Sequence, residues 1–339
     1  MPQKPKVFVH LLTEVVKPGI CVACGSCVSV CPEGAISFID NAPKLTGKCT
    51  ACGTCYLSCP RTGLEFNAEL KTEEPCGIIM KALSIQTTSD EIKAHAQDGG
   101  AASAILSAFL DSGGETAIVA GLDKDGVWAP VPVLAYTKEK VVECAGTKYT
   151  AAPMILGLIE AKKQGLKKIA LVGTPCEMQA LTRRNKALPD GVDVLGVGLF
   201  CMETFNHDKL MTYLVEQGVD PLKVKKFEIR RGSFIARVEG GEPFELKVRK
   251  LKELVRPCCR VCLDYTSENA DVSVGNVGSP DDWSTVLIRT QKGEEAVNAA
   301  QKAGLIKVKM LSDVQPGMIL LEKLSVNKKR DNGVKSTVI

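Results

Sequence analysis

The sequence has few histidines, no long apolar run and no strong excess of charge of one sign. Only His10, His95 and His207 occur among 339 residues, so chemistry that depends on a histidine acid or base is not favoured. No stretch of eighteen apolar residues is present, which predicts no transmembrane segment. The N-terminus lacks the apolar core and cleavage site of a secretory signal. A net charge of +4 predicts no nucleic-acid partner, although it would suit an anionic small ligand or an acidic protein.

Cysteine is abundant instead, and eight of the fifteen cysteines form two copies of one motif. The motif is C-x-x-C-x-x-C-x-x-x-C-P, which holds 4Fe–4S clusters in bacterial-type ferredoxins, with the fourth cysteine of each copy lent to the other cluster. Gly25 and Gly53 supply the backbone freedom that a tight turn between ligands needs. Zinc ligation or disulfides fit this spacing poorly. The first cluster is therefore assigned to Cys21, Cys24, Cys27 and Cys59, and the second to Cys49, Cys52, Cys55 and Cys31.

The length predicts a second, larger unit after the cluster motifs. We expect a small α+β two-cluster ferredoxin module over residues 1–66, a linker over 67–75, and an α/β domain over 76–339. Alternating strand and helix patterns in the larger unit predict a mostly parallel or mixed sheet covered by helices. Expected helices span 101–110, directly after Asp98-Gly99-Gly100, and 154–163, 175–184 and 208–217. Expected strands span 35–39, 63–66, 116–121, 131–136, 168–173, 192–200, 225–230, 233–238, 270–274, 285–289 and 305–310.

Four cysteines outside the motifs predict a third 4Fe–4S cluster. Cys176 and Cys201 follow two expected strands, and the carboxyl ends of parallel strands share one edge of a sheet. Cys259 and Cys262 form a C-x-x-C pair that would complete the set. Taken singly, Cys176 could be a reactive thiolate and Cys201 an inert core thiol, and Cys258 could replace Cys259. The cysteines left over, Cys76, Cys144 and Cys258, are expected to be packing thiols.

Several motifs in the larger unit resemble one flavoprotein family. They are Gln97-Asp-Gly-Gly, Ala145-Gly-Thr-Lys-Tyr, Val172-Gly-Thr-Pro-Cys, Phe200-Cys, Pro257-Cys-Cys-Arg-Val-Cys-Leu-Asp-Tyr, Ala270-Asp-Val-Ser-Val-Gly and Asp282-Trp-Ser-Thr. The family is the beta subunit of coenzyme F-420-reducing hydrogenase and its relatives, and the match runs from about Cys76 to Arg289. With the fused clusters, the layout looks most like the electron-input subunit of archaeal reduced-F-420 dehydrogenase.

The resemblance implies FAD, one 4Fe–4S cluster in the flavin domain and a 5-deazaflavin substrate. No G-x-G-x-x-G fingerprint is present, so FAD is expected mainly from the resemblance. Its expected contacts are Gln97, Asp98, Gly99, Gly100, Gly146, Thr147, Lys148, Tyr149, Thr174, Gly275 and Asn276. An ordinary turn, a surface loop and a strand end are the alternatives for these segments. Asn276 stands where the family often has an acidic residue.

The expected activity is oxidation of reduced coenzyme F-420. Hydride would pass to FAD, and single electrons would leave through three 4Fe–4S clusters to a partner such as a membrane-associated dehydrogenase or a heterodisulfide reductase. No protein residue is assigned as catalytic, because the hydride chemistry belongs to the flavin. The alternatives are a same-family reductase that takes ferredoxin electrons to an organic substrate, and a non-catalytic polyferredoxin relay. The expected location is the cytoplasm, or the inner face of the membrane through a partner.

Overall fold

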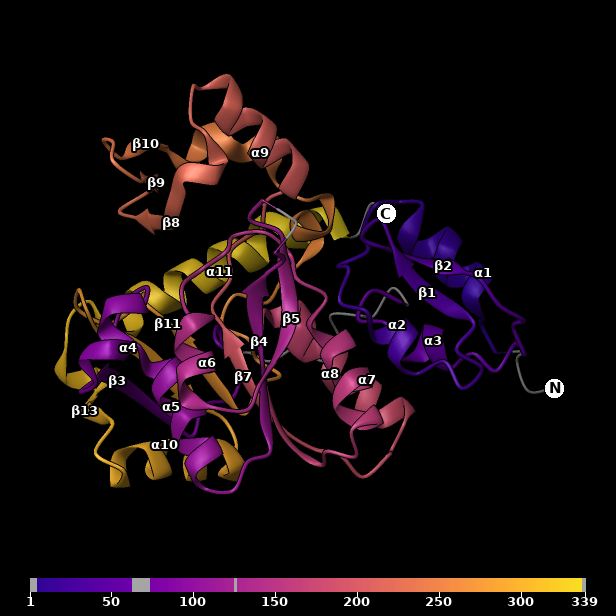
Figure 1. The fold of residues 1–339 in the computed structure, drawn as a ribbon, viewed down its shortest axis with the longest axis horizontal. Helices are drawn as coiled ribbons and strands as arrows, with labels where there is room; N and C mark the ends of the chain where they lie inside the picture. The colour runs from indigo at the N-terminus through magenta and orange to yellow at the C-terminus, as the bar shows by residue number, and fades with distance from the viewer. Residues whose placement is uncertain (1–4, 63–73, 125–126, 337–339) are drawn as a thin grey trace.

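The computed structural model describes residues 5–62, 74–124 and 127–336 (Figure 1). The strand expected at 63–66 and most of the expected linker lie outside these ranges. Within the described ranges, no helix is both long and apolar enough to cross a bilayer.

The N-terminal module is small and contains two short helices that each follow a left-handed glycine. Gly25 precedes α2 with φ 83° and Gly53 precedes α3 with φ 81°, as the tight turns between cysteines require. A hairpin turns through Asp40 and Asn41, both in the left-handed region. Its second strand was not expected from the sequence. The elements are α1 (Phe8–Leu11), α2 (Ser26–Ser29), β1 (Ile36–Ile39), β2 (Ala42–Leu45) and α3 (Thr54–Leu57).

An eight-stranded mixed sheet forms the centre of the larger unit, in the order β13-β3-β12-β11-β7-β6-β4-β5. The strands are β3 (Lys81–Thr87), β4 (Thr116–Leu122), β5 (Pro130–Ala135), β6 (Lys168–Gly173), β7 (Asp193–Leu199), β11 (Val272–Gly275), β12 (Ser284–Ile288) and β13 (Ile306–Met310). Neighbouring strands β4, β6, β7 and β11 pair in parallel, and the other pairs are antiparallel. The predicted α/β class with a mixed sheet is confirmed.

Helices cover both faces of this sheet, because its central strands are apolar on both sides. On β6, Ala170 packs in the cluster of α5 and α10, whereas Ile169 and Leu171 pack in the cluster of α7 and α8. One face carries α4 (Asp90–His95), α5 (Ala101–Asp111), α6 (Lys138–Glu143) and α10 (Gln291–Lys302). The other carries α7 (Gly157–Lys163), α8 (Pro175–Ala187) and α11 (Gly317–Ser336).

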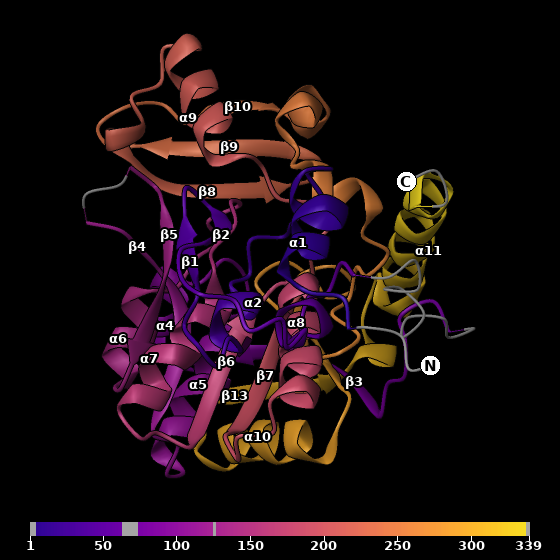
Figure 2. The ribbon, with the colours of Figure 1, turned by 90° about the vertical axis from the view of Figure 1, so that its right-hand side faces the viewer.

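A separate three-stranded antiparallel sheet stands above the carboxyl edge of the main sheet (Figure 2). It consists of β8 (Val224–Arg230), β9 (Ser233–Val238) and β10 (Phe244–Lys247), and it packs against α9 (His207–Glu216). The expected hairpin between β8 and β9 is present, with Arg231 and Gly232 both at positive φ. Phe205, Phe227 and Phe234 are buried in one cluster with residues of α9. The long excursion between β7 and β11 therefore has an apolar core of its own.

Strand β3 and helices α10 and α11 are among the elements that the sequence pattern did not predict. Strand β3 lies inside the sheet, yet polar residues Ser84, Gln86 and Thr87 interrupt its apolar pattern. In α11 the apolar residues 318–321 are consecutive, so the helical period is hidden. Tertiary packing, rather than local pattern, determines β3 and α11.

The module and the larger unit are joined by buried contacts. The Ile155 N–H donates to Cys24 O at 3.1 Å, and a Cβ on Gly25 would come within 2.5 Å of the Leu156 side chain. Val22 and Cys24 belong to the same apolar cluster as α7 and α8. The cluster motifs are thus packed directly on one helical face of the main sheet, and Figure 1 shows α2 beside α8.

Candidate functional site: three groups of thiols and the carboxyl edge

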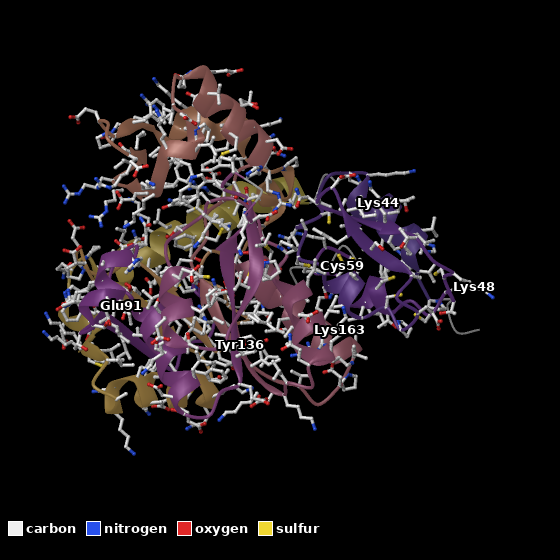
Figure 3. The ribbon with its side chains drawn as sticks, viewed as in Figure 1. Lys44, Lys48, Cys59, Glu91, Tyr136 and Lys163 are labelled. Atoms are coloured by element: carbon white, nitrogen blue, oxygen red, sulfur yellow. The ribbon has the colours of Figure 1, made fainter. Side chains whose placement is uncertain are left out.

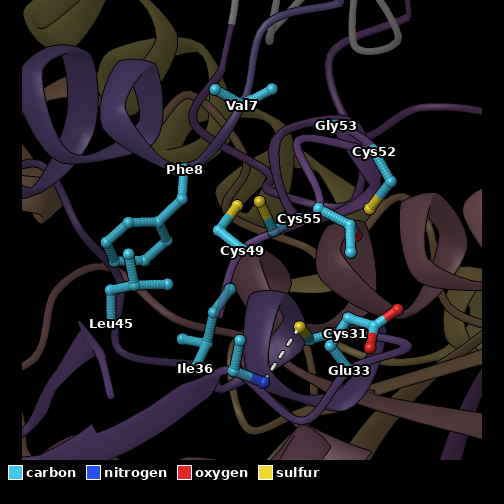
Figure 4. A pocket seen from close by; sticks show the side chains of 12 residues that line it. Val7, Phe8, Cys31, Glu33, Ile36, Leu45, Cys49, Cys52, Gly53 and Cys55 are labelled. Carbon is cyan, nitrogen blue, oxygen red and sulfur yellow. Dashed lines mark hydrogen bonds between the residues drawn. The ribbon is translucent and has the colours of Figure 1, made fainter. Parts of the chain in front are cut away.

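Two cavities in the module are each lined by four cysteines, and the sets are those that the motif spacing assigns. One cavity is lined by Cys21, Cys24, Cys27 and Cys59. The other is lined by Cys31, Cys49, Cys52 and Cys55, and Figure 4 shows these thiols around one space. Main-chain N–H groups approach the sulfurs, with Ala35 N 3.3 Å from Cys31 Sγ and Arg61 N 3.4 Å from Cys59 Sγ. Hydrogen bonds of this kind tune the sulfurs that ligate iron.

The thiols of each set are spread around the cavity that they line. Among the described residues, no three His, Cys, Asp or Glu side chains are arranged to hold a single metal ion. A 4Fe–4S cluster makes a different demand, because each of its four cysteines ligates a different iron of the cubane. Each cavity is lined by the four cysteines that such a cluster needs.

The buried thiols of these cavities would remain protonated without a cation. Burial raises the pKa of Cys59 to about 12, and burial together with the Cys52 thiol raises the pKa of Cys55 to about 11. Burial also raises the pKa values of Cys24 and Cys27 well above the usual range. A metal cluster removes this penalty because it takes the place of the protons. The two cavities therefore fit 4Fe–4S clusters chemically.

A third group of thiols converges at the carboxyl edge of the main sheet. Cys176 lies in the first turn of α8, Cys201 follows β7, and the 3-10 segment η6 (Pro257–Val261) carries Cys259 and leads to Cys262. Burial raises the pKa of Cys201 well above its usual range, and the thiols of Cys259, Cys176 and Cys262 raise it further. The four cysteines are thus close enough to interact electrostatically. Their ligation of one cluster stays a prediction.

Cys258 differs from its neighbour Cys259. The Cys258 side chain is buried in the apolar cluster of α7 and α8 and hydrogen bonds to Cys259, which raises the pKa of Cys258 and lowers that of Cys259. Thr204 N and Thr204 Oγ1 lie 3.4 Å and 3.5 Å from Cys259 Sγ. The Thr204 contacts to the Cys259 sulfur, together with the burial of Cys258 among apolar side chains, favour Cys259 over Cys258 as a ligand.

The helix that carries Cys176 begins at a capping box. Thr174 is the N-cap, Pro175 follows it, and the Glu177 carboxylate accepts hydrogen bonds from Thr174 N at 2.7 Å and Thr174 Oγ1 at 3.1 Å. Thr174 Oγ1 also lies 3.2 Å from Cys176 Sγ. Thr174, expected at the flavin, thus belongs to the immediate surroundings of the third thiol group.

Two arginines, the buried Arg61 and the half-buried Arg256, join the third thiol group to the first cavity, and no sequence pattern marked them out. The Arg61 guanidinium is buried and interacts with the thiols of Cys262 and Cys176. It also favours the thiolates of Cys21 and Cys59, whose pKa values burial raises. Arg256 donates to Cys21 O and Val22 O, each at 3.2 Å. Figure 3 shows Cys59 on the side of the module that faces the larger unit.

The loop 97–100, expected at the flavin, lies against the sheet and is packed tightly. A Cβ on Gly99 would lie 2.4 Å from both Ile85 O and Ser284 N, so only glycine lets the loop rest there. Asp98 Oδ1 is 3.7 Å from Arg230 Nη2 of β8. Burial raises the pKa of Asp98 to about 6, and Arg230 opposes that shift. Packing therefore sets the shape of this loop.

The loop 146–149 is organised by its own lysine. Lys148 Nζ donates to the carbonyls of Cys144 at 2.5 Å, Ala145 at 3.1 Å and Gly146 at 2.9 Å, which uses all three of its protons. The Ile229 N–H of β8 donates to Tyr149 Oη at 2.8 Å. Lys148 thus shapes the loop instead of reaching outward for a ligand.

Two buried oxygens near these loops have no hydrogen-bond partner in the described parts of the chain. They are Gln97 Oε1 and Thr150 Oγ1. Strand β8 holds both segments, because Arg230 Nη2 donates to Gln97 O at 3.5 Å and Tyr149 accepts from Ile229. Buried polar atoms without partners are costly unless a ligand or water satisfies them. This region therefore fits a polar ligand such as a flavin.

Gly275 and Asn276 have local roles at the end of β11. A Cβ on Gly275 would lie 2.1 Å from the Phe200 ring, so this glycine makes room for the ring. The Asn276 carbonyl accepts from Ser279 N at 3.4 Å. Packing and a turn account for both residues, and their expected contact with the flavin stays a prediction.

The remaining thiols lie in apolar surroundings. Cys76 is buried in a cluster with Tyr265, Leu287 and Leu321. Cys144 packs against the cluster of α5 and α10. Both positions agree with packing roles, and neither cysteine belongs to the three thiol groups described above.

The chain matches known families over most of its length. Residues 82–159 and 166–314 match the N-terminal and C-terminal parts of "Coenzyme F420 hydrogenase/dehydrogenase, beta subunit", and residues 14–37 match "4Fe-4S binding domain". The beta subunit of the coenzyme F420 hydrogenase of Methanosarcina barkeri is 39% identical over 77% of this chain and 92% of its own length. A component of the F(420)H(2) dehydrogenase of Methanosarcina mazei is 31% identical over 95% of this chain and 92% of its own length.

A solved structure agrees with these sequence matches. A chain of the xenon-derivatised F420-reducing [NiFe] hydrogenase complex from Methanosarcina barkeri superposes with a TM-score of 0.73 and 37% identity. The match covers 78% of this chain and 94% of that one. The chain belongs to the coenzyme F-420 hydrogenase/dehydrogenase beta-subunit family and carries a 4Fe–4S ferredoxin motif in its N-terminal module.

Proposed function

We propose that this chain is the electron-input subunit of an F-420-linked oxidoreductase, which oxidises reduced coenzyme F-420 and passes the electrons singly to a partner complex. Bound FAD would supply the hydride acceptor, and three 4Fe–4S clusters would supply the one-electron carriers. The observation that carries the proposal is the convergence of Cys176, Cys201, Cys259 and Cys262 beside two further, motif-encoded thiol groups.

The order of the three thiol groups supports a directed path. Arg61 interacts with thiols of both the third group and the first cavity, so these two groups are neighbours. The second cavity includes Cys49 and Cys52, whose side chains are exposed. Electrons would therefore pass from the larger unit through the first cavity to the second, and leave to a partner at the exposed end of the module.

The flavin is assigned to the region where β8 meets the loops 97–100 and 146–149. Gln97 Oε1 and Thr150 Oγ1 would gain hydrogen bonds there, and Asp98 and Arg230 would contribute charge. Lys148 and the glycines would act by holding the loops in shape. Under this assignment the ferredoxin module takes residues 1–66 and the flavin domain residues 76–339.

Anaerobic mixing with reduced F-420 tests the proposal. Protein reconstituted with iron, sulfide and FAD should show bleaching of the flavin band, followed by bleaching of the iron–sulfur band. Turnover with a ferredoxin donor but none with F-420 would instead identify a reductase that runs in the other direction. Protein that binds no flavin after reconstitution would identify a relay without hydride chemistry.

A further inference from the structure

The C-terminal helix α11 presents one buried stripe that ends at the third thiol group. Leu321, Ser325 and Lys328 are buried, and Asn332 continues the same spacing of three to four residues along one side of the helix. Figure 1 shows α11 running across the larger unit towards the module. The matched family segments end at residue 314, so the helix lies outside them.

Lys328 brings a positive charge to this thiol group. Its Nζ donates to Cys201 O at 2.5 Å and to Asp264 O at 2.8 Å, and the residue is 4% exposed. The thiols of Cys262, Cys201 and Cys259 all interact with it electrostatically. A buried ammonium group held by two carbonyls therefore lies close to three of the four proposed ligands.

Asn332 bridges the C-x-x-C segment. Its Nδ2 donates to Cys259 O at 3.0 Å and to Cys262 O at 2.8 Å. Both partners are carbonyls, so the amide nitrogen is the group that must face them. The side chain therefore fixes the distance between the two cysteines of the pair.

We infer that α11 is part of the third cluster's site, with Lys328 setting the reduction potential of that cluster and Asn332 holding its Cys259–Cys262 segment in place. Both are positioning residues that act through the backbone and the local charge. The inference rests on the third cluster of the proposed function.

The sign of the Lys328 effect follows from charge. Reduction adds one negative charge to a cluster that is already anionic with its four thiolates, and a buried cation favours the more negative state. Lys328 therefore raises the reduction potential. Removal of its charge should make the third cluster harder to reduce.

The first experiment is a redox titration monitored by electron paramagnetic resonance. The signal of the third cluster is identified as the one missing from Cys176→Ser. Lys328→Met should lower its midpoint, so that the ratio of reduced to oxidised cluster at a fixed potential falls by about tenfold, equivalent to about 59 mV for one electron. Lys328→Arg should keep the midpoint near that of the wild type. Lys323→Met changes an exposed lysine of the same helix and should leave all signals unchanged.

The second experiment follows loss of the cluster instead of its potential. Asn332→Ala should release the third cluster's iron to a chelator about ten times faster than the wild type, because the loss of an outer hydrogen bond typically weakens a metal site by that factor or more. Asn327→Ala, on the same helix, is the matched control. Release from the module should stay unchanged.

The outcomes separate this inference from the proposed function. Wild-type protein that binds about eight irons, and not about twelve, would remove the third cluster and the inference with it. A full complement of iron, with a midpoint in Lys328→Met equal to that of the wild type, would overturn the role of Lys328 alone. Equal chelation rates in Asn332→Ala and the wild type would overturn the role of Asn332.

Discussion

The module and the third thiol group both present four cysteines, but these cysteines are brought together in different ways. In the module, the four cysteines of each set come from two short motifs, and glycines at positive φ turn the chain between them. In the larger unit, Cys176, Cys201, Cys259 and Cys262 come from three separate segments that the sheet brings together. The first arrangement is local and the second depends on the whole fold. Local sites should tolerate distant changes that the dispersed site does not.

Removal of one thiol from each group is the largest test of this comparison. Cys176→Ser and Cys59→Ser should each lower the iron content from about twelve to about eight per chain, because each removes one ligand of one cluster. The clusters lost should differ, and Cys176→Ser should spare both clusters of the module. Cys144→Ser, outside all three groups, should retain the full content. Iron analysis and spectroscopy measure these changes. An iron content in Cys176→Ser equal to that of the wild type would show that Cys176 is not a cluster ligand.

A methyl group on Gly99 tests how far the carboxyl edge depends on close packing. Gly99→Ala should lower the free energy of unfolding by about 3 kcal/mol and weaken flavin binding, since the new Cβ meets backbone atoms on both sides. Gly241→Ala, where the nearest atom would be 3.9 Å away, should change stability by less than about 0.5 kcal/mol. Denaturant titration and flavin fluorescence measure the two effects. Equal stability of the two variants would show that the loop can move away from the sheet.

Arg61 lies where the local and dispersed sites meet, so its charge should affect both. Arg61→Met should lower the midpoints of the first and third clusters, each by an amount near the tenfold change in ratio, about 59 mV, while the second cluster stays the same. Arg61→Lys should restore part of the shift. Redox titration of each cluster signal measures these midpoints, and a change confined to one cluster would show that the guanidinium acts on that cluster alone.

The pH dependence of stability at Asp98 is the smallest expected effect. The pKa of Asp98 rises from 3.8 in the unfolded chain to about 6 in the folded chain. As pH increases between these two values, the unfolded chain releases the proton before the folded chain does, so the stability of the wild type falls. Asp98→Asn has no titrating group at this position and therefore does not lose stability in this way. The stability of Asp98→Asn relative to the wild type should increase by about 1 kcal/mol between pH 5 and pH 8. Urea titrations at both values measure it, with the exposed Asp281→Asn as control; the opposite trend would mean that Arg230 outweighs burial.

The cluster motifs and most strands of the larger unit were predictable, whereas several parts of the site were not. Motif spacing assigned the two cysteine sets of the module, because three ligands of each set lie within one motif and the fourth comes from the other motif. The positions of three basic residues near the thiols could not be predicted from the sequence: Arg61, Arg256 and Lys328. Sequence alone does not distinguish a lysine or arginine packed inside the protein from one on the surface. The spatial role of Gly275 was equally hidden, because the ring of Phe200 that it accommodates comes from another segment.

The sequence by itself determined the eight motif cysteines, the mixed α/β class and the family, because each depends on local spacing or on ordered motifs. Only the tertiary structure decided which long-range partners surround the third thiol group. Strand β3 inside the sheet, the three-stranded sheet above its edge and the helix α11 beside Cys259 all depend on contacts between residues far apart in the chain. Burial and charge at such contacts arise from the folded packing, and no local pattern records them.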